Sequence, residues 1–537
     1  MRLFKRFRGH PGLLILHLAL LLVLAGGIIT ALTAREGTVI LRPGETATTA
    51  LQADGTALPL GFTLGLENFE TEYYPSSETP RNYLSHITID GRPATVGVNA
   101  PVSAGRFRIY QSSFLDEHTP VLAVRADLPG TATVFAGFAL FLIGGIIWLA
   151  GRWRRTGAFI LLGLAALGAR AEKIPVLNPE VVDSLQRQTV ICQGRAMTVS
   201  TVCRDALRKV SGARSYRGLS AERAMLSFAA FPAQWADQPI IRTKAGLRSL
   251  RDCFGADGRY LMAGDRDADE RVGILLMLTG GSLMTPAEEP LSPARTEAEL
   301  LYNRVPATMI VFIGLFLAAL GSLWRRGAWL AWAVLAFEGV VIGLECWFTG
   351  HGPFSNMFET LQFLSLMTGV IALTVRGMRT VGLFAAGAMA LVAHLQYSNP
   401  VMTQLMPVLH SPWLSLHVSL VMTSYALLVL ASLTALAGIL RPSRADLLRP
   451  RALQLLRPGL FLLGLGIASG AVWANESWGR YWGWDPKETW ALITFLLYAI
   501  PLHRRRPALW LIALPLLSVL MTYFGVNYLP SLHSYAR

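Results

Sequence analysis

Tryptophan is concentrated in one short stretch near the C-terminal end of this 537-residue chain. Residues 473–490 hold five of the fourteen tryptophans, namely Trp473, Trp478, Trp482, Trp484 and Trp490. Gly479 and Gly483 lie among the central three, and this mixture predicts a flat apolar surface that allows close backbone approach. A planar aromatic ligand would fit such a platform. The alternative is an aromatic belt, because tryptophan is favoured where a membrane meets water.

The end of this stretch also has the sequence of a helix start. Asp485 suits the N-cap, Pro486 the first helical position and Glu488 the third. A belt and a cap together explain Trp490 and the acidic residues. They do not explain the crowding of the three tryptophans that come before the cap.

Four of the ten histidines stand at positions that fit iron ligation. His417 and His533 are predicted to share the outer face with the tryptophan stretch. His17 and His503 are predicted to share the inner face. Imidazole is a common ligand for haem iron, and an ionisable side chain inside a membrane span is costly enough to indicate function. For any one of these histidines alone, the alternative is a solvated or hydrogen-bonded side chain.

Membrane-spanning helices must position these side chains. Hydrophobic residues make up 53% of the chain and charged residues 15%, which is too apolar for a set of soluble domains. The apolar runs are about twenty residues long, enough to cross a hydrocarbon core of roughly 30 Å. We predict a polytopic α-helical membrane protein with about eleven transmembrane helices. Their limits are 13–32, 131–150, 156–171, 305–323, 328–347, 355–375, 380–395, 413–440, 458–473, 488–502 and 507–527.

The basic residues predict the orientation of these helices. Nineteen Lys and Arg side chains fall at one end of the alternating spans, against one acid, Asp446. By the positive-inside rule that end is cytoplasmic, so the N-terminus is inside and the C-terminus outside. The net charge of +14 therefore reflects topology and does not indicate a nucleic-acid partner. The first apolar run is longer than is usual in a signal peptide, and we interpret it as a retained anchor.

Two long segments are predicted to lie outside the membrane. Residues 33–130 alternate apolar with polar residues between Gly and Pro, which predicts a small β-rich extracytoplasmic domain. Residues 172–303 predict a second, mostly helical extracytoplasmic domain. Cys192, Cys203 and Cys253 belong to it, and one disulfide among them is compatible with an outside compartment. The chain has no CxxC or CxxCH motif, so it carries no c-type haem attachment site of its own.

The C-terminal region resembles the CcsA (ResC) half of the System II cytochrome c synthetases. The resemblance rests on the string WGRYWGWDPKE at 478–488, which is the WWD motif, with its flanking histidines, and on 352–361, 413–426 and 525–535. It covers 304–537, which we interpret as a haem-handling membrane domain. Residues 1–171 are similar to CcsB (ResB), though shorter than is usual for that half. Residues 172–303 resemble the extracytoplasmic region that links the two halves in fused proteins.

This resemblance implies a function in the bacterial cytoplasmic (inner) membrane, with both soluble domains in the periplasm. Haem b would enter a membrane site ligated by His17 and His503, and would pass to an outer site. There His417 and His533 would be the axial ligands. The reaction would join the haem vinyl groups to the thiols of the CxxCH motif in apocytochrome c as thioethers.

The resemblance also implies roles for single residues and for partners. The catalytic set is His417, His533, Trp478, Trp482, Trp484 and Asp485, and the haem-binding set adds His17, His503, Trp473, Arg480 and Lys487. Arg480 and Lys487 are assigned to the haem propionates, with snorkelling at the interface as their alternative. The partners are apocytochrome c, thiol-reducing proteins that keep its CxxCH motif reduced, and membrane lipid. Because the CcsB-like region is short, a further CcsB-type subunit is a candidate partner as well.

Two other functions stay open at this point. A haem exporter or chaperone would share the WWD motif without making the thioether. A proton-coupled secondary transporter would use buried groups such as Glu338 and Glu345, but it predicts two similar halves, and the sequence shows no such repeat. We assign no role to these two acids. His351, His394 and His410 are interpreted as ordinary interfacial residues.

Overall fold

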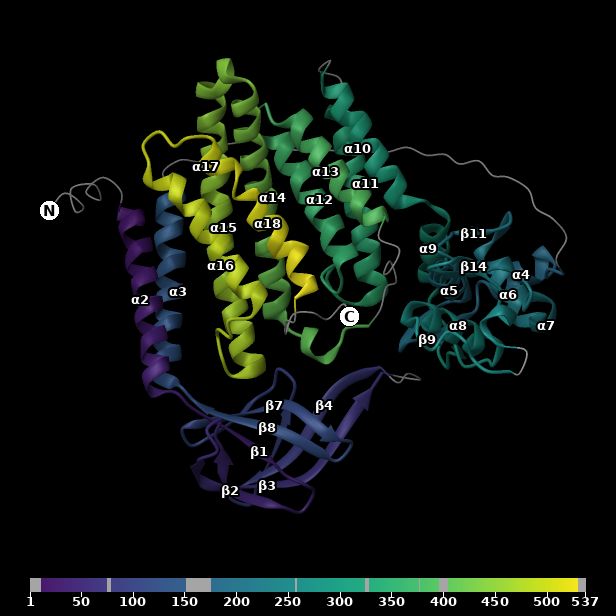
Figure 1. The fold of residues 1–537 in the computed structure, drawn as a ribbon, viewed down its shortest axis with the longest axis horizontal. Helices are drawn as coiled ribbons and strands as arrows, with labels where there is room; N and C mark the ends of the chain where they lie inside the picture. Colours follow the sequence, from purple (N-terminus) through teal and green to yellow (C-terminus); the bar gives the residue numbers. More distant parts are fainter. Residues whose placement is uncertain are drawn as a thin grey trace.

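The computed structural model describes residues 11–74, 79–150, 175–255, 258–323, 328–375, 377–395 and 404–529. Figure 1 shows a bundle of long helices, with a β-rich domain at one end and a second small domain beside it. We call the end that faces the β-rich domain the tryptophan end, because it carries residues 473–490. The opposite end carries His17 and His503 and is called the histidine-pair end. The predicted span 156–171 and the predicted ligand His533 lie outside the described residues.

Seven described helices or broken helices are long and apolar enough to cross a membrane. They are α2 (Pro11–Thr33), α3 (Leu128–Ala150), α11 (Ala328–Thr349), α12 (Met357–Thr374), α14 (Pro412–Leu440), α15 (Ala445–Trp478), and the segment with α17 (Trp510–Ala513), α18 (Leu516–Tyr523) and η5 (Gly525–Tyr528). An eighth arises if α9 (Pro293–Arg304) and α10 (Ala307–Leu323), bent by 56°, form one span. The prediction of a helical membrane-type protein is confirmed.

Two predicted spans appear as shorter helices. The span 380–395 is α13 (Arg379–Leu395), and 488–502 is α16 (Pro486–Ala499) followed by η4 (Ile500–His503). Neither α13 nor α16 meets the length of a full span by itself. The count of eleven transmembrane helices therefore stays a prediction.

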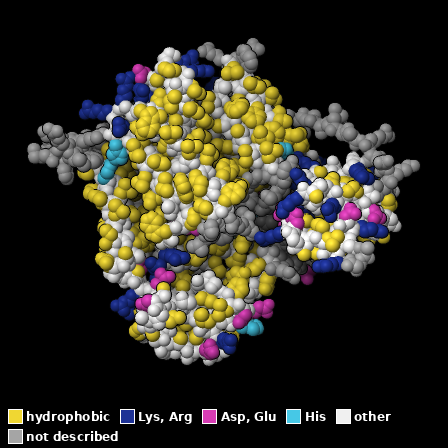
Figure 2. Space-filling model, in the orientation of Figure 1, with side chains coloured by type: hydrophobic (Ala, Val, Ile, Leu, Met, Phe, Trp, Pro, Cys, Tyr) yellow, Lys and Arg dark blue, Asp and Glu magenta, His cyan; other side chains and the backbone are white. Residues whose placement is uncertain are grey.

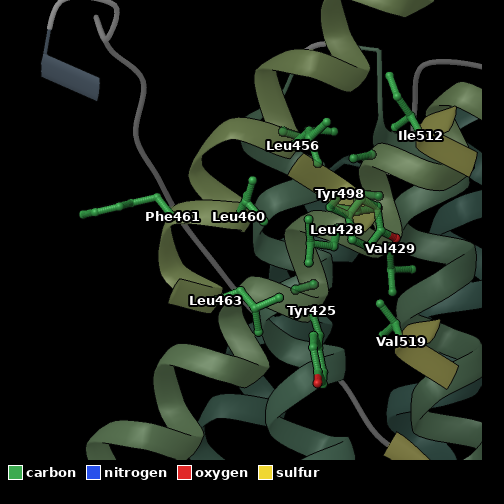
Figure 3. Packing of buried hydrophobic residues seen from close by; sticks show 14 of the residues in the cluster. Tyr425, Leu428, Val429, Leu456, Leu460, Phe461, Leu463, Tyr498, Ile512 and Val519 are labelled. Atoms are coloured by element: carbon green, nitrogen blue, oxygen red, sulfur yellow. The ribbon is translucent and has the colours of Figure 1, made fainter. Parts of the chain in front are cut away.

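The helix α15 exceeds its predicted span 458–473 at both ends. It runs for 34 residues with Pro450 and Pro458 inside it, although each proline removes one backbone hydrogen bond. Packing against α14 along its length compensates for this loss. Figure 3 shows Leu428 of α14 and Leu456 of α15 in this buried cluster, together with Tyr498 of α16.

Glycines bring α2 and α3 close together. A Cβ atom added at Gly12 would lie 2.5 Å from the backbone nitrogen of Trp148, and one at Gly144 would lie 2.9 Å from that of Leu16. Small residues of this kind let two helix backbones approach each other. The pair joins the bundle through Phe141 of α3, whose ring stacks on Phe461 of α15 with centroids 5.8 Å apart. Phe461 accordingly points away from the other labelled side chains in Figure 3.

The β-rich domain predicted for 33–130 is an eight-stranded antiparallel sheet. Its strands are β1 (Arg35–Ile40), β2 (Thr46–Leu51), β3 (Ala57–Tyr73), β4 (Pro80–Ile89), β5 (Arg92–Gly97), β6 (Val102–Ala104), β7 (Phe107–Asp116) and β8 (Thr119–Ala126), in the spatial order β5-β4-β3-β2-β1-β8-β7-β6. Alternate residues such as Leu64 and Leu66 face its core, as the two-residue period of a strand requires. The sheet begins just after α2 and ends just before α3, so this helix pair holds the domain at the tryptophan end.

Short helices form the core of the second domain. They are α4 (Pro179–Leu185), α5 (Val199–Ser211), α6 (Ala221–Ala230), α7 (Pro232–Trp235), η1 (Arg251–Cys253), α8 (Arg266–Thr279) and α9. The strands are short: β9 (Thr189–Cys192), β10 (Arg195–Thr198), β11 (Ser215–Tyr216), β12 (Leu219–Ser220), β13 (Ile241–Thr243), β14 (Gly246–Arg248) and β15 (Thr285–Pro286). A buried ion pair joins Arg195 to Glu299 at 3.0 Å. Arg295 donates to the carbonyl of Phe348 at 2.8 Å, which attaches the domain to the end of α11.

The cysteines of this domain are free thiols in the structure. Cys192, Cys203 and Cys253 are all buried, and Cys346 of α11 is also free. Burial raises the pKa of the Cys192 thiol to about 11, and it also raises the pKa of Cys203. These thiols are therefore protonated at neutral pH and are weak nucleophiles.

Figure 2 shows how side-chain types divide over one face of the molecule. Hydrophobic side chains cover the helical bundle, and Lys and Arg gather at its upper end, which is the histidine-pair end. Arg449 and Arg506 belong to this end, and both pair with Asp446 at 2.7 Å. An apolar belt with basic residues at one end is typical of a membrane protein.

Candidate functional site

Two histidines that are 486 residues apart in the sequence meet at the histidine-pair end. His17 lies on α2, and His503 ends the 3₁₀ turn η4 after α16. Their Nε2 atoms are 3.3 Å apart, and the two rings are almost perpendicular at 86°. Two nitrogens on opposite sides of one metal ion would be roughly 4 Å apart, at about 2 Å each. A small outward movement of either ring therefore makes room for an ion between them.

The backbone fixes which nitrogen of each ring faces the other. His17 Nδ1 lies 2.8 Å from the carbonyl of Leu13, and His503 Nδ1 lies 2.9 Å from that of Ala499. A carbonyl only accepts, so each Nδ1 must donate its proton. In this tautomer each Nε2 carries the lone pair, and it is the nitrogen that can coordinate a metal cation.

His417 at the tryptophan end is also held by a backbone carbonyl, but one from a different helix. Its Nδ1 donates to the carbonyl of Gly466 at 2.7 Å, which leaves Nε2 as the nitrogen with the lone pair. A Cβ atom added at Gly470 would lie 2.6 Å from His417 Nδ1. Gly466 and Gly470 are four residues apart on α15, so one provides the acceptor and the other the room for the imidazole ring.

Tryptophans stand next to this imidazole. The rings of His417 and Trp473 are nearly parallel, with an interplanar angle of 22° and centroids 6.5 Å apart. Trp478 meets Trp473 edge to face, with centroids 5.0 Å apart. Trp473 is only 1% exposed and packs on Leu409 and Leu414. Trp473 is therefore part of the wall of this site, and the exposed aromatic surface is provided by its neighbours.

The loop after α15 presents the remaining tryptophans. Gly479 ends the helix with φ +72°, the left-handed conformation that glycine adopts at low cost. Trp484 also has a positive φ, +56°, which is rare for a bulky residue, and its side chain is 71% exposed. Trp482 meets it edge to face at 5.8 Å. Strained backbone of this kind is common at ligand sites, and here it turns the Trp484 indole outward.

The predicted start of the next helix is confirmed in detail. Asp485 is the N-cap of α16, with its carboxylate accepting from the backbone of Lys487 at 2.9 Å, and Glu488 completes a capping box. Glu488 also accepts from the backbone of Gly483 at 2.8 Å. The Asp485 carboxylate is 6% exposed and engaged in this cap. These contacts give both acids a structural role that is sufficient to explain them.

The two predicted propionate partners flank this loop. Arg480 is half-buried beside Gly483, where an added Cβ would lie 3.6 Å from its Nε. Among the described residues, no carboxylate oxygen lies within 4.0 Å of a side-chain nitrogen of Arg480. Lys487 lies in the first turn of α16 and is half-buried as well. Their assignment to the propionates of a haem stays a prediction.

The β-rich domain contacts the same region directly. Arg108 forms two hydrogen bonds with Glu476 in the last turns of α15, at 3.1 and 2.8 Å. Hydrogen bonding to Glu476 raises the pKa of Arg108, so this guanidinium stays charged. A Cβ atom added at Gly479 would lie 2.7 Å from the ring of Tyr110. The close backbone approach predicted at Gly479 is thus toward Tyr110 of the sheet, not toward a ligand.

A further chain of hydrogen bonds ties the loop to α2 and α3. Tyr481 donates to the hydroxyl of Thr30 at 2.6 Å, and Thr30 donates to the carboxylate of Asp127 at 2.8 Å. The N-terminal part of the chain therefore supplies a ligand candidate at one end of the bundle and supports the tryptophan loop at the other.

One of the two buried acids of α11 and three of the other histidines have identified hydrogen-bond partners. Glu345 accepts from Tyr302 at 2.6 Å and from Gln362 at 3.4 Å, which makes it a polar contact between helices. Glu338 lies on the same face of α11 and is 2% exposed. His410 is bonded to Tyr74, His394 to Thr308 and His351 to the carbonyl of Gly352.

Sequence reasoning missed the residues that support the site. Gly466 and Gly470 form a GxxxG pattern, which is a signal for close helix packing. The charged pair of Arg108 and Glu476 had no signal, because 368 residues separate the partners. The polar link between Thr30 and Tyr481 is equally invisible in the sequence.

Comparison with known proteins places these elements in one family. Residues 330–533 match the Cytochrome C assembly protein family, and residues 6–128 match the ResB-like family. Protein NrfI of Wolinella succinogenes is 28% identical over 89% of this chain and 72% of its own length. The cytochrome c biogenesis protein CcsA of Parasynechococcus marenigrum is 36% identical over 36% of this chain and 80% of its own length. CcsA of Synechococcus sp. (strain CC9605) is also 36% identical, over 84% of its length. A ResB-like part and a CcsA-like part are thus joined in one polypeptide, and the chain belongs to the cytochrome c biogenesis proteins as a fused CcsB-CcsA protein.

Proposed function

We propose that this protein carries haem b across the bacterial inner membrane and attaches it to apocytochrome c. The observation that carries the proposal is the pairing of His17 and His503, whose Nε2 atoms lie 3.3 Å apart with both Nδ1 atoms on backbone carbonyls. Haem iron is commonly held by imidazole. The pair would receive haem as a substrate, and His417 with the tryptophan loop would receive it next.

The orientation in this proposal places the histidine-pair end at the cytoplasm. The basic side chains at that end support it through the positive-inside rule. The tryptophan end, the β-rich domain and the domain at 172–303 would then lie in the periplasm. His533, as the second axial ligand of the outer site, and the span 156–171 belong to the same proposal.

Attachment is an addition reaction that consumes no oxidant. The sulfur of each CxxCH thiol bonds to one carbon of a haem vinyl group, and the thiol proton goes to the other carbon. The contribution of His417, Trp478, Trp482 and Trp484 would be to hold and orient the haem while apocytochrome c approaches. Arg480 and Lys487 would pair with its propionates. Other proteins would keep the two thiols reduced.

The test is expression together with an apocytochrome in a bacterial strain that lacks its own maturation system. Haem staining after denaturation detects only covalently attached haem. We expect staining with the unchanged chain and a loss of roughly tenfold or more in His417→Ala. His118→Ala is the matched control, because His118 is an exposed histidine of the β-rich domain. Equal staining of His417→Ala and the control would contradict the assignment.

A second candidate function is haem export without attachment. The tryptophan loop and the histidine pair favour haem handling in both cases, so the same strain must separate them. An exporter would co-purify with haem but would give no covalent stain on the apocytochrome. Covalent stain in the absence of any other maturation protein would exclude export alone.

A further inference from the structure

The segment that leads into α14 has its backbone carbonyls satisfied by another domain. Residues 404–411 contain the 3₁₀ turn η2 (Pro407–Leu409) and end where α14 begins. Tyr74 of the β-rich domain donates to the carbonyl of Leu405 at 3.1 Å. Asn99 of the same domain directs its side-chain Nδ2 at the carbonyls of Pro407, Val408 and His410, at 3.2, 3.2 and 3.1 Å. Backbone groups away from water need such partners, so the conformation of this segment depends on the β-rich domain.

The same Asn99 side chain also reaches α15. Its Oδ1 accepts a hydrogen bond from the hydroxyl of Ser477, which is 4% exposed in the last turn of that helix. One amide therefore joins the beginning of α14 to the end of α15. These contacts span 308 to 378 residues of sequence.

The backbone at Asn99 is shaped for this contact. Asn99 has φ +60°, a left-handed conformation that asparagine tolerates better than most residues. It stands in the tight connection between β5 and β6, where Gly97 and Ala100 form a bridge. A backbone conformation that residues rarely adopt persists where the surrounding structure stabilises it. Here it aims the amide at the two helices.

The two helix ends joined by Asn99 are those that form the tryptophan-end site. The segment 404–411 packs on Trp473 and Trp478 through Leu409 and Val408. His417 follows on the second turn of α14. A change in the distance between the segment and Ser477 would therefore move His417 relative to the tryptophans.

We propose that Asn99 is a positioning residue for the outer haem site, and that the β-rich domain uses it to set the spacing between His417 and the tryptophan wall. This inference rests on the proposed function, because it assumes that haem occupies that site. It assigns to the ResB-like part of the chain a direct effect on haem ligation in the CcsA-like part.

The test removes the amide and keeps the backbone. Asn99→Gly suits this purpose, because glycine adopts φ +60° without strain. The control is Asp90→Gly, which replaces another residue of positive φ, +49°, whose side chain accepts a hydrogen bond from the backbone of Thr63 within the β-rich domain. We expect Asn99→Gly to lower covalent attachment roughly fivefold, as the loss of about 1 kcal/mol of hydrogen bonding would. The fraction of low-spin haem in the visible spectrum of the purified protein should fall in parallel, and Asp90→Gly should match the unchanged chain in both.

The outcomes separate the two proposals. If the unchanged chain binds no haem and gives no attachment, the proposed function fails. If the unchanged chain is active, and Asn99→Gly equals it in yield and in spectrum, the positioning role is overturned. If Asn99→Gly does not accumulate in membranes, Ser477→Ala takes its place, because it removes one contact of the amide from the other side. An unchanged spectrum and yield in Ser477→Ala would then overturn the inference.

Discussion

The two ends of the helical bundle hold their histidines in different ways. At the histidine-pair end, His17 and His503 face each other at 3.3 Å, and each is fixed by one carbonyl of its own helix. At the tryptophan end, His417 takes its carbonyl from a different helix and rests on Gly470, beside Trp473.

This difference teaches what each end is suited for. In the proposed function, a pair of opposed histidines, one half-buried and the other exposed, would accept a haem and release it again. A histidine that is fixed by neighbouring helices, aromatic rings and a second domain would hold a bound haem in one orientation. A reaction between positioned groups requires such a fixed orientation. In the proposed function, the first end is the entry site and the second is the site of attachment.

The largest expected effect tests whether one end serves for entry and the other for attachment, by supplying haem from outside the cell. His17→Ala, His503→Ala and the double variant should each lower attachment roughly tenfold or more, and the double variant should be no worse than either single one, since both act through one site. Haem added to the periplasmic side of spheroplasts should restore attachment in His17→Ala but not in His417→Ala. The readout is covalent haem on the apocytochrome. Rescue of both variants, or of neither, would remove the distinction between entry and attachment.

The next effect concerns the support of His417. Gly470→Ala would place a methyl group 2.6 Å from His417 Nδ1 and push the imidazole from its carbonyl, so we expect attachment to fall about tenfold. Gly339→Ala on α11 is the matched control, because an added Cβ there meets no atom of the described residues within 4 Å. Haem spectra of the purified variants should change only for Gly470→Ala. If both alanine variants behave alike, the contact with Gly470 has no part in the site.

A smaller effect distinguishes a helix-capping role of Asp485 from a role of its charge in attachment. Asparagine caps a helix about as well as aspartate, whereas alanine costs about 1 kcal/mol of helix stability. We therefore expect Asp485→Asn to keep most of the attachment yield and Asp485→Ala to lose several-fold. Thermal unfolding of the purified variants should follow the same order. A strong loss in Asp485→Asn with unchanged unfolding would show that the charge itself takes part in attachment.

The smallest effect is expected at the buried cysteines of the second domain. Cys192→Ser should leave attachment unchanged within a factor of about two, because a raised thiol pKa makes this side chain a weak nucleophile. A maleimide should modify Cys203 only after denaturation, since this side chain is 1% exposed. Haem staining of the apocytochrome checks the first point, and mass spectrometry of the alkylated protein checks the second. A disulfide among Cys192, Cys203 and Cys253 would contradict the free thiols of the structure.

Much of the fold was open to prediction because membranes impose simple rules. Apolar length predicted α2, α14 and other spans, and alternation predicted the β-rich domain. The exact extent of α15 was not predictable, because Pro450 and Pro458 usually end a helix, and only packing against α14 overrides that tendency.

The sequence predicted which residues form the candidate site, but it did not predict the contacts that support them. The histidines indicated candidate iron ligands. The tryptophan stretch, which ends in the capping sequence at Asp485, indicated a loop before a helix. Nothing local in the sequence shows that Asn99 binds the segment before α14, or that Gly470 makes room for His417. Such contacts depend on tertiary structure, and a single sequence contains no record of which distant residues meet.

The meeting of His17 with His503 has a consequence for assembly and stoichiometry. One histidine comes from the ResB-like part and the other from the CcsA-like part, so neither part alone contains the pair. Where these parts are made as separate polypeptides, a half-assembled complex would lack the entry site and would leave haem in the cytoplasm. Fusion into one chain guarantees one copy of each half. In the proposed function, the pair would therefore admit haem only after the two halves have docked correctly.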